Sequence, residues 1–133
     1  MNINLIKLLL QLKNASLVKK EVIRYNCNLL CLELLKLLYN EGFIQSFKIE
    51  SKSLSKSEKQ FQTIIMLRYS YNKPALKTLK IISTPSYSKY LTFKDISKVQ
   101  SRKNILFLST NKGLLTGVRC KKNKIGGTLL FVA

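Results

Sequence analysis

The chain has 133 residues, which suits one compact domain or two small packed halves. Its 24 basic and 6 acidic side chains give a net charge of +18, well above the magnitude of about 2 to 8 that is typical of a soluble small domain. No apolar stretch approaches the ~18 residues that a membrane-spanning helix needs, so the composition excludes a membrane span. A charge excess of this size predicts a polyanionic partner.

The charge is unevenly divided along the chain. Residues 1–72 carry a net charge of +6, whereas residues 73–133 carry +12 with a single acid, Asp95. Such an asymmetry between halves indicates where a polyanion binds. The second half is therefore the expected binding half, and a merely solvated charged face is the alternative interpretation.

Residues suited to catalysis or to metal binding are scarce. The chain has no histidine, one aspartate, no paired glutamates and no glycine-rich phosphate loop, so we expect no enzyme activity, no cofactor and no small-molecule substrate. Cys27, Cys31 and Cys120 are an odd number without disulfide-framework spacing, which favours a reducing compartment and core thiols. Without histidine or a CxxC pair, no metal site is expected.

Two helices are expected in the first half. Leu5, Leu8, Leu9 and Leu12 repeat at three-and-four spacing and predict a helix over residues 4–13. A short strand is expected over residues 18–24, although Ile23 interrupts its alternation. The second helix is expected to begin at an asparagine cap and to end at Gly42. The cap is Asn26 or Asn28, and the apolar face comprises Leu30, Leu34, Leu37 and Leu38.

The first half is expected to continue as a hairpin. Alternation over residues 43–50 predicts a strand with Phe47 and Ile44 on opposite faces, and residues 61–69 form a second apolar run. The serine- and lysine-rich residues 51–59 are expected to form a flexible, solvated tip. The turn at residues 72–74 places a boundary between an N-terminal α/β half, residues 1–73, with two helices packed on a small sheet, and a second half, residues 74–133.

The second half is expected to be mostly β with one short helix, which makes the whole chain α+β. Short β-favouring segments occur at residues 76–83, 89–93, 105–109 and 128–132. Residues 116–122 are expected to be helical or a turn. This half also contains three groups of polar, basic and small residues that lie in its loops.

Each group has side chains suited to RNA contact, and each also has an alternative interpretation that involves no RNA. Hydroxyls and tyrosine rings bind sugars, phosphates and bases, ammonium groups neutralise phosphates, and glycines permit close approach. Alternatively, the first group is a turn with half-buried tyrosines, the second an ordinary hairpin turn and the third a basic loop. The groups are Ser83, Thr84, Pro85, Tyr87, Lys89 and Tyr90; Ser109, Thr110, Asn111, Lys112 and Gly113; and Lys121, Lys122, Lys124, Gly126 and Gly127.

With these motifs the sequence resembles the small-subunit ribosomal protein eight family over roughly residues 2–133. The ending ILFLSTNKGLLTGVRCKKNKIGGTLLFVA is similar to the family's strand, STSKG-like turn, short helix, GGE-like turn and final strand. An SxPGxRxY-like element lies at residues 83–90 and an LxxEGFI-type helix end at residues 38–44. The chain departs from the family pattern at Ser86, Ser88, Gly117 and Thr128, and Thr116 is a possible replacement for the missing helix-capping aspartate.

The resemblance implies a structural protein of the small ribosomal subunit. It implies binding to a helix in the central domain of small-subunit rRNA, a role in subunit assembly and translation, and neighbouring small-subunit ribosomal proteins as partners. The RNA contacts would come from residues 109–113, from Pro85 with Tyr90, and from Gly126 with Gly127. The alternative is a general basic architectural nucleic-acid-binding protein without a fixed site, and a module for acidic membranes or proteins is a weaker one.

Amino-acid usage indicates where the protein works. Lys, Asn, Ile, Leu and Ser are abundant and Ala is scarce, as an AT-rich gene would impose. No arginine-rich, acid-poor extension precedes the family's start, so an import peptide is not expected. A mitochondrial ribosome in the matrix is the expected location, with a plastid or a bacterial cytoplasm as alternatives.

Overall fold

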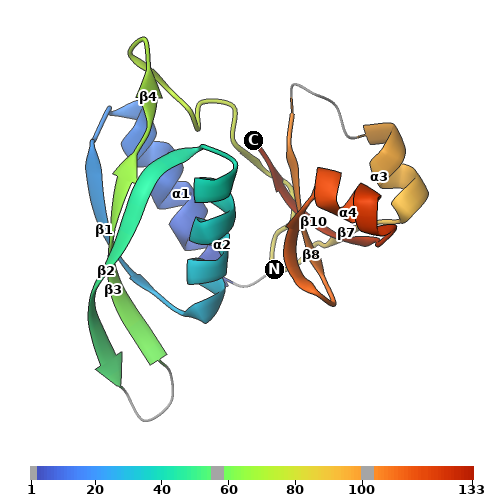
Figure 1. Cartoon of the computed structure of the whole chain (residues 1–133), viewed down its shortest axis with the longest axis horizontal. Helices are drawn as coiled ribbons and strands as arrows, with labels where there is room; N and C mark the ends of the chain where they lie inside the picture. Colours follow the sequence, from blue (N-terminus) through green and yellow to red (C-terminus); the bar gives the residue numbers. More distant parts are fainter. Residues whose placement is uncertain (1–2, 55–58, 100–103) are drawn as a thin grey trace. The chain divides into compact units, whose positions relative to one another are not determined.

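The computed structural model describes residues 3–54, 59–99 and 104–133 (Figure 1). The chain divides into two compact units: an N-terminal unit, Asn4–Lys77, and a C-terminal unit, Thr78–Ala133, which also includes Ile3. Each unit combines helices with an antiparallel sheet, so the predicted α+β class is confirmed. The division expected from the sequence, into residues 1–73 and an rRNA-binding half of residues 74–133, stays a prediction.

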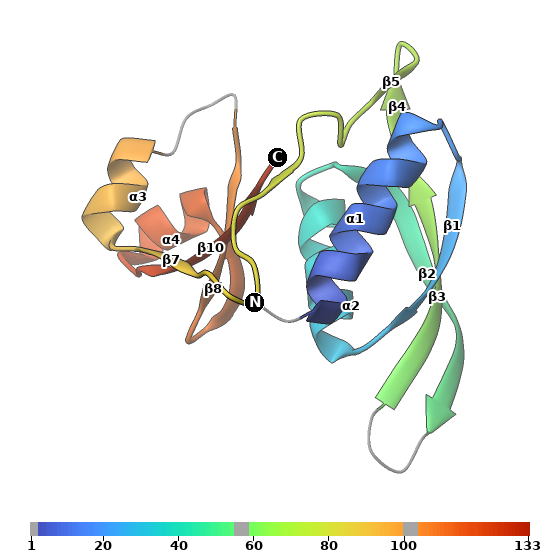
Figure 2. The same ribbon diagram turned by 180° about the vertical axis from the view of Figure 1, so that it is seen from behind.

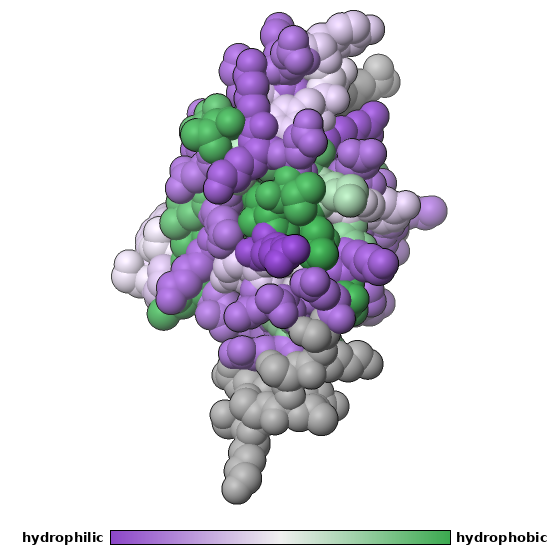
Figure 3. Space-filling model, turned by 90° about the vertical axis from the view of Figure 1, so that its left-hand side faces the viewer, coloured by the Kyte–Doolittle hydropathy of each residue, from purple (hydrophilic) through white to green (hydrophobic). Residues whose placement is uncertain are grey.

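The N-terminal unit has two helices, a three-stranded sheet of order β1-β3-β2 and a small hairpin. Helices α1 and α2 cover one face of the sheet, and the other face is open (Figures 1 and 2). Figure 3 looks onto the open face, where an apolar patch is surrounded by hydrophilic side chains. The elements are α1 Ile3–Leu17, β1 Val22–Cys27, α2 Leu29–Asn40, β2 Ile44–Leu54, β3 Lys59–Leu67, β4 Tyr69–Ser70 and β5 Lys73–Pro74.

Helix α1 buries the four predicted leucines but is longer than the sequence indicated. It continues to Leu17 because Ala15 and Ser16 are also buried, and the Ser16 hydroxyl donates to the Lys13 carbonyl at 2.7 Å. The strand predicted over residues 18–24 is consequently wrong at its start, since β1 begins only at Val22. Ile23, which interrupted the predicted alternation, is one of the buried residues of β1.

Helix α2 begins and ends as predicted. The Asn28 side chain accepts from the Cys31 backbone N–H at 2.9 Å, which satisfies one orphan amide of the first turn. Gly42 follows the helix with a φ of +81°, a left-handed value that favours glycine. Leu30 is exposed rather than part of the apolar face, and Leu35 is fully buried in that face.

Strand β2 does not keep the strict alternation expected of it. Its pairing with β3 is irregular between Ile44 and Ser46, so Ile44 pairs with Leu67 while Phe47 pairs with Ile65. Because Leu67 and Ile65 face the helices and are buried, Ile44 and Phe47 share one face, and the prediction of opposite faces is wrong. Within the predicted hairpin tip, residues 55–58 lie outside the described residues.

The C-terminal unit is organised around its last strand. Strand β10 pairs antiparallel with β8 along one edge and with β6 and β7 along the other, and β9 pairs with β8. All four predicted strand regions therefore contain a strand, although β6 is much shorter than residues 76–83. The elements are β6 Lys80–Ile81, β7 Lys89–Leu91, α3 Phe93–Val99, β8 Leu106–Thr110, β9 Gly113–Thr116, α4 Gly117–Asn123 and β10 Gly127–Val132.

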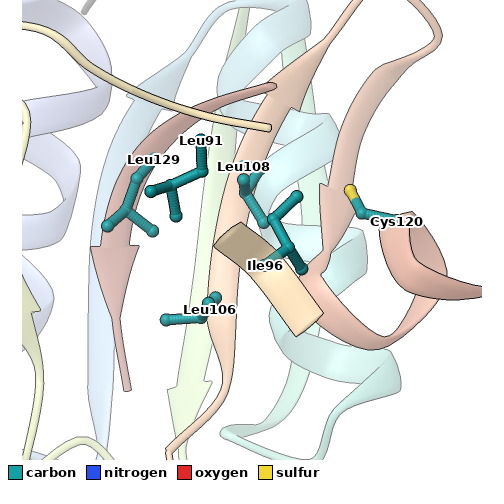
Figure 4. Packing of buried hydrophobic residues seen from close by; sticks show 6 residues of the cluster. All are labelled: Leu91, Ile96, Leu106, Leu108, Cys120 and Leu129. Atoms are coloured by element: carbon teal, nitrogen blue, oxygen red, sulfur yellow. The ribbon is translucent and has the colours of Figure 1, made fainter. Parts of the chain in front are cut away.

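Helices α3 and α4 cover one face of this sheet. A hydrophobic cluster fills the space between the strands and the two helices (Figure 4). On the opposite face Phe107 and Phe131 stack with ring centroids 4.4 Å apart, and both are buried. The residues of the cluster are Leu91, Ile96, Leu106, Leu108, Cys120 and Leu129.

Helix α4 matches the predicted helical segment, but α3 and β9 were not predicted. The sequence carries a signal for α3 in Thr92 and Asp95. The Asp95 carboxylate accepts from the Thr92 N–H and hydroxyl, and the Asp95 N–H donates to the Thr92 hydroxyl at 3.4 Å. This reciprocal pattern is a capping box, which marks the start of a helix.

Candidate nucleic-acid interface

The turn between β8 and β9 presents the second predicted group. Thr110 pairs with Gly113, and this leaves Asn111 and Lys112 exposed at the apex. The Thr110 hydroxyl donates to the Gly113 carbonyl at 2.9 Å and accepts from the Lys112 N–H at 3.2 Å. Gly113 has a φ of +101°, which disfavours other residues. Thr110 therefore fixes the turn, and Asn111 and Lys112 are the side chains that the turn offers to a partner.

The glycine pair before β10 lies against the other two groups. A Cβ atom at Gly127 would lie 2.6 Å from the Ser109 carbonyl oxygen, and one at Gly126 would lie 3.0 Å from the Tyr90 hydroxyl. These distances are shorter than van der Waals contact, so the missing side chains allow the protein's own strands to approach. Gly127 is buried and Gly126 is half-buried. The expectation that the two glycines also permit close approach of RNA stays a prediction.

Cross-strand register places hydroxyl groups beside a tyrosine ring on one face. Tyr90 of β7 pairs with Thr128 of β10, which pairs with Ser109 of β8. Residues directly opposite in an antiparallel sheet point to the same face, so the three side chains form a row. Tyr90 is 64% exposed, and Thr128 and Ser109 are half-buried. Thr128 was not among the binding residues predicted from the sequence. Its position next to Gly127, in a strand with alternating faces, is the feature that could have identified it.

The loop before β7 holds the first predicted group, and one of its members is not accessible. Thr84 and Tyr87 form an isolated bridge through two backbone hydrogen bonds of 2.8 and 3.2 Å, with Pro85 exposed in the turn between them. Ser83 is fully buried, and its hydroxyl donates to the Leu129 carbonyl. The Ser83 hydroxyl therefore stabilises the packing of this loop on β10, and an RNA contact by Ser83 stays a prediction.

The basic members of the groups are exposed. Lys121 and Lys122 occupy the last turn of α4, where cations interact favourably with the helix dipole. Lys124 ends the helix in a left-handed conformation with a φ of +55°, and the following Ile125 N–H donates to the Cys120 carbonyl at 3.0 Å. Lys89 is exposed on β7. These ammonium groups are free to meet phosphates.

The acid of the C-terminal unit is charged at neutral pH. Hydrogen bonds from the Thr92 hydroxyl and N–H, together with the nearby Lys98, hold the pKa of Asp95 below its usual 3.8. The unit Thr78–Ala133 accordingly carries 11 basic side chains and one acid, a net charge of +10. Its exposed turns therefore lie in a strongly positive field, which attracts polyanions.

One buried polar atom near α4 differs from the expectation for that helix. Thr116 occupies the N-cap position, yet its side chain makes no capping hydrogen bond. Its hydroxyl is buried and has no hydrogen-bond partner within the described residues. The expectation that Thr116 replaces the capping aspartate of the family pattern is therefore wrong.

The cysteines are buried and free. Burial raises the pKa of the Cys27 thiol to about 11, and burial also raises the pKa values of Cys31 and Cys120. They behave as core thiols, in agreement with the sequence. Over the described ranges, no three Cys, His, Asp or Glu side chains form a group that could hold a metal ion. In the same ranges, no helix is long and apolar enough to cross a membrane.

These features define a class: a small, strongly basic α+β protein whose C-terminal unit carries exposed polar turns, tyrosines and lysines. The particular family follows from comparison with known proteins. The chain belongs to the ribosomal protein S8 family, whose model, described as Ribosomal protein S8, matches residues 4–132. The family resemblance stated from the sequence is confirmed. Members of this family are structural components of the ribosome and not enzymes.

Relatives match over nearly the whole chain. The small ribosomal subunit protein uS8 of Malacoplasma penetrans is 33% identical over 92% of this chain and 91% of its own length. The uS8c protein of Tupiella akineta is 34% identical over 92% of this chain and 91% of its own. The uS8m protein of Acanthamoeba castellanii is 38% identical over 77% of this chain and 76% of its own.

Proposed function

We propose that this chain binds a helix in the central domain of small-subunit rRNA through its C-terminal unit, and thereby supports assembly of the small subunit and translation. One observation carries the proposal. The three residue groups that the sequence singled out come from separate segments, yet Gly126 lies against Tyr90 and Gly127 against Ser109 and Thr110. Members of all three groups, from segments far apart in sequence, are therefore in contact at one sheet.

The proposed contacts are the accessible members of the three groups. Their hydroxyl and amide groups suit 2′-hydroxyls and base edges, their rings suit bases, and their ammonium groups suit phosphates. Neighbouring small-subunit ribosomal proteins are the expected protein partners. The contact residues are Thr84, Pro85, Tyr87, Lys89, Tyr90, Ser109, Thr110, Asn111, Lys112, Gly113, Lys121, Lys122, Lys124 and Gly126.

We further propose that the ribosome is mitochondrial and lies in the matrix. The AT-rich residue usage and the uS8m relative of Acanthamoeba castellanii support this location. The uS8c and bacterial relatives support the plastid and bacterial alternatives. Fractionating the source cells and detecting the chain on ribosomes of one compartment distinguishes these locations.

Binding of the full chain to RNA tests the rRNA proposal. A transcript of the central domain should bind more tightly than a duplex DNA of equal length at about 150 mM salt, because small polar turns suit the shape and 2′-hydroxyls of RNA. Equal affinity for both would favour the general architectural alternative.

Two variants at the β8–β9 apex separate specificity from charge. Asn111→Ala should cost roughly 1 to 3 kcal/mol on the cognate transcript and little on random RNA. Lys112→Ala should weaken binding to both and lower the slope of log affinity against log salt by about 0.7 to 0.9. Lys36→Ala, on the exposed side of α2, is the matched control. Thr110 is left intact because its hydroxyl closes the turn. If both variants bound like the parent, the apex would not contact RNA.

A further inference from the structure

The hairpin of β4 and β5 ends in an unusual turn. Ser70 pairs with Lys73, so Tyr71 and Asn72 form a two-residue connection, and Figure 2 shows this hairpin projecting beyond the end of the three-stranded sheet. Both residues have left-handed φ values, +51° and +61°. These values are those of a type I′ turn, which favours Asn-Gly, Asp-Gly or Gly-Gly.

Tyr71 is poorly suited to the place it occupies. A left-handed conformation brings the Cβ atom of an L residue close to the following carbonyl, and only glycine, asparagine and aspartate adopt it readily. The Tyr71 side chain is 97% exposed, so burial of its ring does not offset that strain. The ring therefore contributes nothing to the stability of the isolated chain and is fully available to a partner.

The hairpin is firmly attached at its base. The Tyr69 hydroxyl donates to the Lys20 carbonyl, and the Ala75 N–H donates to the Arg68 carbonyl at 3.1 Å. The Arg68 guanidinium in turn donates to the Gly42 carbonyl at 3.2 Å. The ring of Tyr71 is thus presented by an anchored support and not by a free loop.

The segment around the ring is positively charged. Within the N-terminal unit, residues 68–77 contain Arg68, Lys73 and Lys77 and no acid. The hydrogen bonds from Tyr69 to Lys20 and from Arg68 to Gly42 add the neighbouring Lys19, Lys20, Glu21 and Glu41. The local net charge therefore stays positive. A protein-binding aromatic is normally surrounded by contacts that exclude water, whereas an exposed ring among cations is the arrangement on which unpaired bases stack.

We propose that Tyr71 stacks on an unpaired base of small-subunit rRNA, which gives the N-terminal unit an RNA contact separate from the turns of the C-terminal unit. This contact rests on the proposed function in so far as rRNA is the partner. Stacking accepts any base, because every base has a π face, and the adjacent lysines hold the strand through its phosphates.

A unique fluorophore tests the contact directly. The chain contains no tryptophan, so a Tyr71→Trp variant reports from this position alone, and a Tyr39→Trp variant reports from α2, where Tyr39 is 51% exposed. Adding a transcript of the complete small-subunit rRNA should quench the first variant strongly and the second little. Binding itself is followed by filter retention. Retention without quenching would overturn the stacking contact alone, whereas no retention by the parent chain would overturn the proposed function and this contact together.

Opposite effects on binding and folding separate a contact from a structural role. Tyr71→Asn places a turn-favouring residue at the same position, so the melting temperature should rise by several degrees. Affinity for the transcript should fall roughly five- to 150-fold, the range for loss of one stacked base, with an unchanged salt dependence. Tyr71→Phe keeps the ring and should bind like the parent. An affinity of Tyr71→Asn equal to that of the parent would contradict the proposal. A blue shift of the tryptophan emission of Tyr71→Trp on adding small-subunit proteins, but not on adding RNA, would also contradict it and would indicate a protein partner.

Discussion

In the N-terminal unit, the residues that form the core are different from the residue proposed to contact RNA. In the C-terminal unit, several residues belong to both sets. Leucines of α1 and α2 and the inner face of the sheet supply the core of the first unit, and Tyr71 lies outside it. In the second unit, Ser83, Thr110, Gly126 and Gly127 belong to the predicted binding groups and also hold strands and turns in place. Changes in the C-terminal unit should therefore alter folding and binding together.

Charge differs between the units mainly through the acids. Asn4–Lys77 has 13 basic and 5 acidic side chains, and Thr78–Ala133 has 11 basic side chains and one acid. Basic residues are thus present in both units, and the C-terminal unit has a single acidic side chain, Asp95, that would repel a phosphate backbone. This difference supports the C-terminal unit as the principal binding region and leaves room for a second contact on the other unit.

The largest effect is expected from Gly127→Ala. The added methyl would lie 2.6 Å from the Ser109 carbonyl oxygen, so β8 and β10 must separate, at a cost of typically 1 to 3 kcal/mol. Affinity for the rRNA transcript should fall as well, since Ser109 and Thr110 move. Denaturant unfolding and filter binding measure the two effects.

Gly113→Ala is the matched control for Gly127→Ala. No atom lies within 4 Å of a Cβ at Gly113, but its φ is +101°, so the cost is conformational, about 1 kcal/mol. If Gly127→Ala were no more destabilising than Gly113→Ala, the close strand approach would not be what requires glycine at 127, and the coupling of folding to binding would lose its main support.

A smaller loss is expected from Ser83→Ala. Ser83 donates from its hydroxyl to the Leu129 carbonyl and from its N–H to the Leu130 carbonyl at 3.1 Å, at the place where the pairing of β10 with β8 shifts register. Removing the hydroxyl leaves a buried acceptor without this donor, which costs about 1 to 2 kcal/mol. Ser86→Ala, at an exposed position of the same loop, should leave the melting temperature unchanged. Equal melting temperatures for the two variants would show that the Ser83 hydroxyl does not support the register shift between β10 and β8.

In the N-terminal unit, a change of stability should leave binding intact. Asn28→Ala removes the cap of α2, whose amide oxygen accepts from the Cys31 N–H, and should cost about 1 kcal/mol. RNA affinity per folded molecule should equal that of the parent. Asn26→Ala is the control, because Asn26 lies exposed within β1. Affinity is also measured at temperatures where Asn28→Ala is fully folded. A loss of affinity at those temperatures would show that changes in the N-terminal unit do alter RNA binding.

Local patterns predicted much of the fold. The leucine spacing of α1 and α2, the Asn28 cap and the Gly42 terminus depend on neighbours within one helical turn, and all are read from adjacent residues. The start of β1 and the shared face of Ile44 and Phe47 depend on pairing with β3, which is distant in sequence. Helix α3 was missed although Thr92 and Asp95 carry its capping signal.

The candidate site was predictable in its residue types but not in their roles. The groups were recognisable because hydroxyls, lysines and glycines cluster in loops. The burial of Ser83 and the approach of Gly127 to Ser109 follow from tertiary contacts between segments up to 46 residues apart. The bond of Thr110 within its own turn is local, but the choice between this bond and a contact with a partner is not encoded in the residue type. Sequence alone does not say whether a small residue makes room for a ligand or for another strand of the same protein.

The smallest effect is expected from pH, through the single acid of the C-terminal unit. Hydrogen bonds from Thr92 and the nearby Lys98 hold the folded pKa of Asp95 below 3.8, so its contribution to stability is present above about 3.8 and is lost as pH falls through the lower, folded value. The carboxylate is fully exposed, and the effect is correspondingly small. Asp95→Asn cannot ionise, so the comparison of the two proteins isolates the contribution of this carboxylate. The difference in melting temperature between parent and Asp95→Asn should therefore be constant from about pH 6 to about pH 5 and shrink toward pH 2. A difference that stayed constant down to pH 2 would show that the charge of Asp95 does not hold the first turn of α3, and that the Thr92 hydroxyl alone caps that helix.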